Sequence, residues 1–189
     1  MKLILASASP RRKELLSLYG LPFTVCAADI DETMDPAKPA SQEVARVSLL
    51  KAQAVPREKD DVVVAADTIG VCNHQILGKP KDFQQAADML KMLSGRDHQV
   101  MTGCSVLYGS MEKTFTEITD LHFRDLSEKE ILRYAAGGEP MDKAGAYGIQ
   151  GGAALFCDRI QGDYYNVVGL PVCRLWETLK QMVPQWTEV

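Results

Sequence analysis

The sequence has no long hydrophobic run, no excess of basic charge and no ordered pattern of cysteines. No stretch approaches the roughly 18 to 20 apolar residues that span a bilayer, and Ser7, Ser9 and two arginines interrupt the short apolar start too early for a secretory signal. The net charge of −4 argues against broad binding to nucleic acid or to a membrane surface. We therefore expect a cytoplasmic protein whose basic side chains bind a small, local anion.

Cysteine and histidine are few and scattered. The cysteines are far apart and show no C-x-x-C spacing: Cys26, Cys72, Cys104, Cys157 and Cys173. An odd, unpatterned set is more typical of free thiols in a reducing compartment than of a disulfide framework or a zinc site. The three histidines are equally dispersed, so structural roles are favoured over a metal or triad role.

The first unusual stretch covers residues 3–16, where an apolar run passes through small hydroxyl residues into a helical pattern. Ser9 suits the N-cap of that helix. Arg11 and Arg12 follow at the positive end of the helix dipole, which is unfavourable unless an anion binds there. We expect a phosphate site with Ser7 beside the two guanidinium groups. The alternative is a solvated basic turn after an ordinary cap.

Two later positions indicate anion and metal chemistry. Lys51 shares a face with apolar residues of a helix expected over 41–55, so its ammonium either binds an anion or reaches solvent past the helix end. Asp67 lies near the end of an unbroken apolar strand expected at 62–68. Ligands of α/β sheets bind at such strand ends, and Mg²⁺ is held by one or two carboxylates together with substrate phosphates. A cap or turn role is the alternative for Asp67.

The rest of the pattern alternates helices with strands and hairpins. We expect strands at 23–27, 99–108 and 113–123, a hairpin over 69–77 that turns near Asn73-His74, helices at 82–93, 127–137 and 172–182, and a closing strand pair at 153–160 and 165–168. This order predicts an α/β fold with a mixed central sheet flanked by helices, in one domain over 1–189, with two lobes around a cleft.

Glycines are concentrated between Asp142 and Gly152. Glycines at such spacing permit positive φ or close approach of the backbone to a ligand. The pattern matches neither the dinucleotide fingerprint nor the P-loop, so both of those nucleotide folds lose their main support.

Several motifs occur together and in order along the chain. They are Leu-Ala-Ser-Ala-Ser-Pro-Arg-Arg from Leu5 to Arg12, Ala-Asp-Thr at 66–68, Gly-Lys-Pro at 78–80, Asp-Lys-Ala-Gly-Ala-Tyr-Gly-Ile-Gln-Gly from Asp142 to Gly151, and Val-Val-Gly-Leu-Pro from Val167 to Pro171. In this combination the chain resembles the Maf-type nucleoside triphosphate pyrophosphatases from about Leu3 to Leu179.

The resemblance implies a cytoplasmic, often dimeric enzyme with a fold like that of inosine triphosphate pyrophosphatases. Such an enzyme cleaves a nucleoside triphosphate between its α and β phosphates with a divalent cation, Mg²⁺ or Mn²⁺. Arg12, Thr68 and Gln150 match the branch that acts on dTTP and UTP, rather than the 7-methyl-GTP branch. Ala8 and Ala65 stand where many members have glycine, and each could slightly narrow the approach of the backbone to the ligand.

The residue chemistry and the resemblance together assign roles within the site. The phosphates are expected to be held by Ser7, Arg11, Arg12, Lys51 and Lys79. The cation is expected to bind to Glu32 and Asp67, and Asp67 is also expected to activate or orient the water. The base or sugar is expected to contact Thr68 and Gln150. The expected partner is the nucleotide, without nucleic acid or membrane. A homodimer is the common default for homo-oligomers, but the sequence marks no interface. Modified pyrimidine triphosphates are further candidate substrates. The alternatives are a nucleotide-sensing regulator linked to septum formation and a pyrophosphatase for another modified nucleotide such as 7-methyl-GTP.

Overall fold

The computed structural model describes residues 1–27 and 29–186. The strands are β1 (Leu3–Leu5), β2 (Phe23–Val25), β3 (Val62–Cys72), β4 (Gln75–Leu77), β5 (Asp97–Tyr108), β6 (Met111–Phe123) and β7 (Cys157–Gln161). The helices are α1 (Pro10–Ser17), α2 (Ala40–Gln53), α3 (Phe83–Leu93), α4 (Glu128–Ala136), α5 (Tyr164–Val168) and α6 (Val172–Met182), with short 3₁₀ turns η1 (Glu139–Asp142), η2 (Ala144–Ala146), η3 (Gly152–Leu155) and η4 (Pro184–Trp186). Among the described residues, no helix is long and apolar enough to cross a membrane.

The strands form a mixed sheet in the order β2-β1-β3-β5-β6-β7, with β4 paired to β3. β1 is parallel to both β2 and β3, and its residue Leu5 lies opposite Val25 and Val64. The β3–β4 and β6–β7 pairs are antiparallel. Parallel and antiparallel neighbours therefore occur in one sheet, and the expected α/β class with a mixed sheet is confirmed.

The chain divides into two compact units. The first unit contains Met1–Asp67, Thr102–Glu117 and the segment from Gly169 onward, and the second contains Thr68–Met101 and Ile118–Val168. The presence of two compact units agrees with the expectation of two lobes. The cleft between lobes and the single domain remain predictions.

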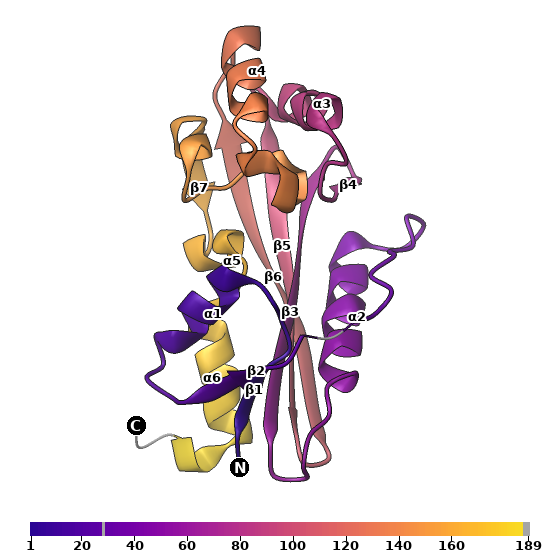
Figure 1. Cartoon of the computed structure of the whole chain (residues 1–189), viewed down its shortest axis with the longest axis vertical. Helices are drawn as coiled ribbons and strands as arrows, with labels where there is room; N and C mark the ends of the chain where they lie inside the picture. The colour runs from indigo at the N-terminus through magenta and orange to yellow at the C-terminus, as the bar shows by residue number, and fades with distance from the viewer. Residues whose placement is uncertain (28, 187–189) are drawn as a thin grey trace. The chain divides into compact units, whose positions relative to one another are not determined.

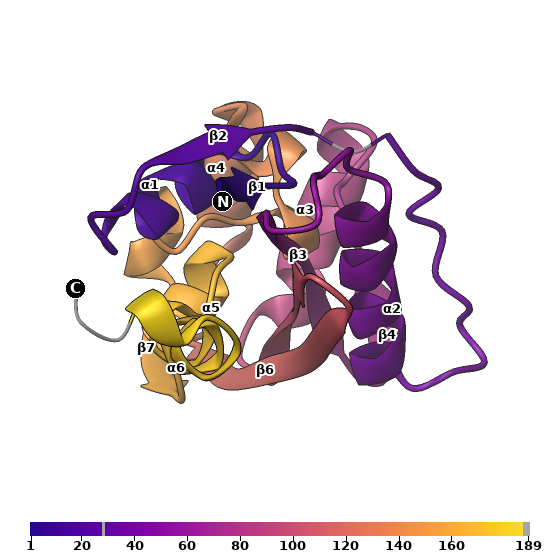
Figure 2. The ribbon, with the colours of Figure 1, turned by 90° about the horizontal axis from the view of Figure 1, so that it is seen from below.

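The first unit is built around β1 and the neighbouring part of β3. Figure 1 and Figure 2 both show α2 on one side of these strands and α1 and α6 together on the other. On the α2 side, small and branched apolar side chains pack into a buried cluster: Ile4, Ala6, Ala52, Val55, Val63, Ala65 and Leu107. On the other side, the Tyr19 hydroxyl donates to the Val172 carbonyl at 2.6 Å and its ring lies 5.0 Å from that of Trp176. These contacts hold the elements that carry most of the predicted site. The expectation that Asp67 lies near the end of its strand is wrong: β3 continues to Cys72, where it pairs with β4, so Asp67 lies within the strand.

The second unit has an aromatic centre made of His98, Phe123, Tyr147 and Phe156. Phe123 packs edge-on against each of the other three rings, with centroid separations of 4.8 to 6.0 Å. Aromatic pairs in this geometry stabilise a core beyond the area they bury. The cluster joins β5 and β6 to the glycine-rich segment, through Tyr147.

Local signals in the sequence correspond closely to the ends of several elements. The side chain of Ser127 accepts from the Glu130 amide and the Glu130 side chain accepts from the Ser127 amide, which confirms the predicted capping box of α4. Asn73 and His74 both have positive φ and turn the β3–β4 hairpin, as expected. At α3 only one of the two hydrogen bonds of a capping box forms. The Asp82 side chain accepts from the Gln85 amide, but the Gln85 side chain accepts from the Lys81 amide instead of the Asp82 amide.

The predicted closing strand pair is wrong. Only Cys157–Gln161 is a strand, and it pairs with β6, whereas Tyr164–Val168 forms the short helix α5. Tertiary contacts override the strand preference of this apolar and aromatic segment. The buried Asn166 amide donates to the Val100 carbonyl at 3.0 Å and to the Thr119 hydroxyl at 2.9 Å. Both bonds are made to strands, so the helix is held in place by its one polar core residue.

Candidate active site

The loop between β1 and α1 carries the first group of predicted residues. Ser9 caps α1, and its side chain accepts from the Arg12 amide. The Ser7 hydroxyl accepts from the Ser9 amide and from Nη1 of Arg12, each at 3.2 Å. Nε of Arg12 donates to the Gly169 carbonyl at 2.9 Å. The structure thus brings Ser7 and Arg12 together, and the guanidinium is oriented by bonds within the protein.

The Arg12 side chain is half-buried, and its charge lies among other charged groups. Burial lowers the pKa of Arg12, and the carboxylates of Asp67 and Glu32 act in the opposite direction and favour its charged form. Arg11, at the preceding position of α1, is also half-buried. Both arginines are expected to hold phosphate, and Arg12 is also expected to contribute to substrate specificity; these roles remain predictions.

Lys51 lies between the two predicted metal-binding carboxylates. Its Nζ is 2.7 Å from Oδ1 of Asp67 and 2.8 Å from Oε1 of Glu32. Lys51 is 7% and Asp67 8% exposed, whereas the Glu32 side chain is 52% exposed. The expectation that Lys51 faces inward is confirmed, and of the two alternatives left open for it, the anionic partner is observed. That partner consists of the protein's own carboxylates.

The charges of this cluster balance. Lys51 and Arg12 contribute two positive charges, and Glu32 and Asp67 contribute two negative charges, so the group is neutral when all four are ionised. Buried charges that are paired avoid most of the penalty of leaving water. Lys51 and Asp67 are therefore compensated by groups of the protein itself.

The donor set fits a hard divalent cation. Carboxylate oxygens of Asp67 and Glu32 already converge on one cationic group, the Lys51 ammonium, and oxygen ligands are those that Mg²⁺ and Mn²⁺ prefer. The part of the chain that the structure describes contains no cluster of three or more acidic, histidine or cysteine side chains that could hold a metal alone. The fit is therefore to a cation that is completed by ligands from elsewhere, such as phosphate oxygens.

The remaining predicted residues, Thr68, Lys79 and Gln150, lie in the second unit. Thr68 is half-buried in β3, while Lys79 and Gln150 are exposed. A backbone hydrogen bond links the segments that carry Lys79 and Gln150, because the Gly145 amide donates to the Gly78 carbonyl at 3.1 Å. The structure thus places Lys79 on a loop that is bonded to the glycine-rich segment that also carries Gln150.

The glycine-rich segment packs closely, but against its own unit. A Cβ on Gly151 would lie 2.0 Å from Oε1 of Glu139, and one on Gly148 would lie 2.6 Å from Cε of Lys143. Gly148 and Gly151 thus make room for the protein's own charged side chains. Of the two reasons that the sequence left open for these glycines, positive φ is confirmed at Gly145, which has a φ of 72°, and close approach to a ligand stays a prediction. Sequence reasoning missed Glu139, because it follows two glycines and a helix end and carries no periodic signal.

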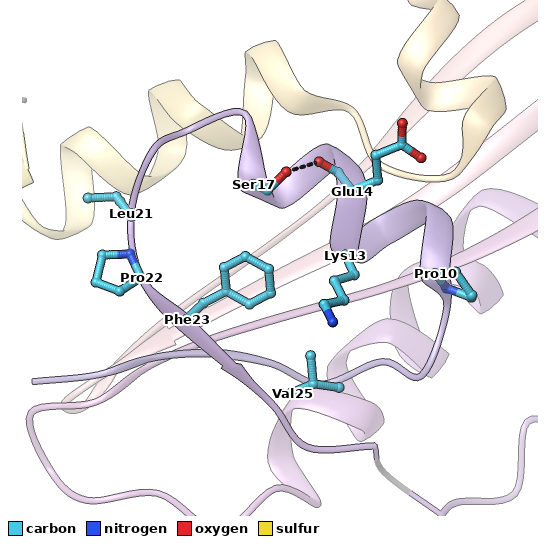
Figure 3. A pocket seen from close by; sticks show the side chains of 8 residues that line it. All are labelled: Pro10, Lys13, Glu14, Ser17, Leu21, Pro22, Phe23 and Val25. Carbon is cyan, nitrogen blue, oxygen red and sulfur yellow. Dashed lines mark hydrogen bonds between the residues drawn. The ribbon is translucent and has the colours of Figure 1, made fainter.

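A shallow hollow of about 730 Å³ lies elsewhere in the first unit, between α1 and β2 (Figure 3). It is lined by Pro10, Lys13, Glu14, Ser17, Leu21, Pro22, Phe23 and Val25. In Figure 3 the Lys13 side chain extends between α1 and β2, and the Ser17 hydroxyl donates to the Glu14 carbonyl at 2.5 Å. None of the predicted site residues lines this hollow, so it is separate from the cluster around Lys51.

Comparison with known proteins places these features in a wider context. The model of the family described as "Maf-like protein" matches residues 2–182. A dTTP/UTP pyrophosphatase of a Geobacillus species is 50% identical over 182 residues, covering 96% of this chain and 98% of the relative. A dTTP/UTP pyrophosphatase of Bacillus cereus is 48% identical over 181 residues, covering 95% of each.

A solved structure, that of the Ham1 protein of Staphylococcus aureus, aligns with 66% of this chain and 73% of its own, at 16% identity and a TM-score of 0.43.

Proposed function

This chain belongs to the Maf family, and we propose that it hydrolyses dTTP and UTP to the nucleoside monophosphate and pyrophosphate. Relatives that share about half of its residues over nearly its full length are named for that activity. The structural observation that supports the proposal best is the cluster in which Lys51 is held between Asp67 and Glu32, whose carboxylates also act on the charge of the half-buried Arg12.

The reaction forms a bond between a water oxygen and the α-phosphorus and breaks the bond from that phosphorus to the oxygen bridging it to the β-phosphorus. The pyrophosphate leaves with that oxygen, and the water gives up a proton. We assign the proton to Asp67, whose carboxylate is placed by β3 and the Lys51 ammonium. Ser7, Arg11 and Arg12 would hold the phosphates at the start of α1, where backbone N–H groups and guanidinium groups both favour anions.

Asp67 and Glu32 would hold Mg²⁺ or Mn²⁺, which supplies charge neutralisation on the phosphate oxygens. The positive charge of Lys51 then affects how the cation binds to these carboxylates. The four side chains of the cluster carry no net charge when ionised, so a divalent cation that bound alone would add two positive charges without compensation. A cation that arrives with a triphosphate is compensated by the negative charges of the phosphates. We therefore propose that metal and nucleotide bind together and that Lys51 is released from the carboxylates toward the phosphates. Lys79 adds a further positive charge for the phosphates.

The test is a panel of dTTP, UTP, CTP, dATP and 7-methyl-GTP, assayed for pyrophosphate release with Mg²⁺ and with Mn²⁺. Asp67→Asn should lower kcat by about 100-fold or more, the range for loss of a general base. Asp60→Asn, at an exposed loop position of the same unit, is the matched control and should keep the wild-type rate. A clear preference for 7-methyl-GTP would overturn the substrate assignment, and near-wild-type turnover by folded Asp67→Asn would overturn the role of that residue.

Tight nucleotide binding without pyrophosphate release would instead support a nucleotide-sensing regulator. A cytoplasmic location and a homodimeric state are part of the proposal. They rest on the sequence and the family resemblance.

A further inference from the structure

Gln150 sits at the tip of a tight turn whose two ends are held by one pair of side chains. The Gly151 amide donates to the Gly148 carbonyl at 3.0 Å, which closes a β-turn with Ile149 and Gln150 at its centre. Ile149 is 8% exposed and anchors the turn, while Gln150 is exposed. The orientation of Gln150 therefore depends on how firmly the ends of this turn are fixed.

Tyr134 fixes the first end. It lies in the last turn of α4, and its hydroxyl accepts from the Gly148 amide at 3.0 Å while it donates to Oε1 of Glu139 at 2.9 Å. Burial raises the pKa of Tyr134, so the hydroxyl keeps its proton and its donor role. Its ring packs edge-on against Phe156 at 5.1 Å, which holds the ring independently of the hydroxyl.

Glu139 fixes the second end. Its Oε2 accepts from the Gly152 amide at 3.1 Å, while its Oε1 accepts from the Tyr134 hydroxyl. One carboxylate therefore connects the tyrosine that holds Gly148 to the amide that follows Gly151. The carboxylate lies directly beneath the turn, since a Cβ on Gly151 would overlap it. Lys143 donates to the Glu139 carbonyl at 2.8 Å and keeps the start of η1 in place.

We propose that Tyr134 and Glu139 are positioning residues that hold the Gln150 turn and thereby set the base preference of the enzyme. This inference rests on the proposed function, in which the Gln150 amide pairs with the donor and acceptor edge shared by uracil and thymine. A side-chain amide discriminates between bases only if its backbone is fixed before the ligand arrives, because a loose turn adapts to a mismatched edge at little cost.

The first experiment measures the turn itself without any nucleotide. The chain has 14 glycines, so ¹⁵N-glycine labelling gives a simple spectrum in which single amides can be followed by hydrogen exchange. Tyr134→Phe should accelerate exchange at Gly148 by roughly 3- to 10-fold for the loss of one hydrogen bond. Glu139→Gln leaves one neutral acceptor oxygen for both the Tyr134 hydroxyl and the Gly152 amide, so it should accelerate exchange at Gly152 by a similar factor. The Gly145 amide, bonded to the Gly78 carbonyl, is the internal reference and should not change.

The second experiment measures base preference as the ratio of kcat/KM for dTTP to kcat/KM for CTP. Gln150→Ala should abolish the preference, and Tyr134→Phe and Glu139→Gln should each lower the ratio by roughly 3- to 10-fold, mainly through KM for dTTP, with kcat at saturation nearly unchanged. Tyr165→Phe, at an exposed tyrosine of the same unit, is the matched control.

The outcomes separate the two proposals. Absence of pyrophosphate release from every nucleotide would refute the proposed function, and an unchanged ratio in Gln150→Ala would refute the part assigned to Gln150. The positioning proposal itself is overturned if Gln150→Ala removes the preference while Tyr134→Phe and Glu139→Gln retain it. It is also overturned if exchange at Gly148 and Gly152 stays at the wild-type rate in both variants.

Discussion

Acidification should destabilise the protein through one buried histidine. His98 is 4% exposed, its Nε2 lies 2.8 Å from the Tyr147 hydroxyl, and its ring packs edge-on against Phe123 and Tyr147. Burial lowers the pKa of His98 from 6.5 to about 4. The folded protein therefore keeps a neutral imidazole at a pH where the unfolded chain has already taken up a proton.

The sign and size of the effect follow from proton linkage. Between pH 6.5 and 4 the unfolded state binds more protons, so the free energy of unfolding falls as the pH falls through this window, and the loss levels off below pH 4. From pH 7 to pH 5 the loss amounts to about 2 kcal/mol. The strongly shifted carboxylates, Glu43 and Glu130, have pKa values of about 2 and act below pH 4.5, so the range from pH 7 to 5 isolates the histidine.

The assay is urea unfolding at pH 7, 6 and 5, followed by far-UV circular dichroism. A loss of about 2 kcal/mol lowers the midpoint by about 1 M. His98→Gln keeps a polar nitrogen near the Tyr147 hydroxyl but cannot titrate, and it should remove most of the shift even though it is less stable at pH 7. His74→Asn, at an exposed turn position with positive φ, is the matched control. The reasoning is refuted if His98→Gln shows the same loss between pH 7 and 5 as the wild type.

Three further changes test the packing and the electrostatics. Gly103→Ala should destabilise the fold by about 1 to 3 kcal/mol, because its Cβ would lie 2.3 Å from a backbone carbonyl of α2, whereas Gly78→Ala has open space and should leave the melting temperature nearly unchanged. Burial raises the pKa of the Cys104 thiol to about 12, so mass spectrometry after alkylation at pH 7 should find the exposed Cys173 modified and Cys104 intact until the protein unfolds. Lys51→Met should tighten Mn²⁺ binding in the absence of nucleotide by roughly 10-fold or more, measured by electron paramagnetic resonance, and equal or weaker binding would contradict the charge balance.

The sequence predicts elements well where the signal is local. The capping box at Ser127 and the Asn73-His74 turn are determined by residues within four positions of one another, and both are confirmed. The inward position of Lys51 follows from helical spacing alone. Such features depend on backbone geometry and nearest neighbours, which a single sequence displays directly.

Features that depend on distant partners are not visible in the sequence. Tyr164–Val168 has the composition of a strand, yet Asn166 finds its partners 66 and 47 positions away and the segment becomes a helix. The link between Lys51 and Glu32 likewise joins residues whose separation carries no periodic signal. Motif resemblance assigned both residues to the site, but only the structure shows that the lysine is held by the carboxylates.

The neutral cluster around Lys51 has a consequence for the protein's life in a cell. Because the ammonium compensates Asp67 and Glu32, the fold does not need a divalent ion to hold these two like-charged carboxylates close together. Under the proposed mechanism, folding and metal supply are uncoupled. A cell short of magnesium or manganese would then hold folded protein that lacks only turnover, and activity would return with the ion and without new synthesis.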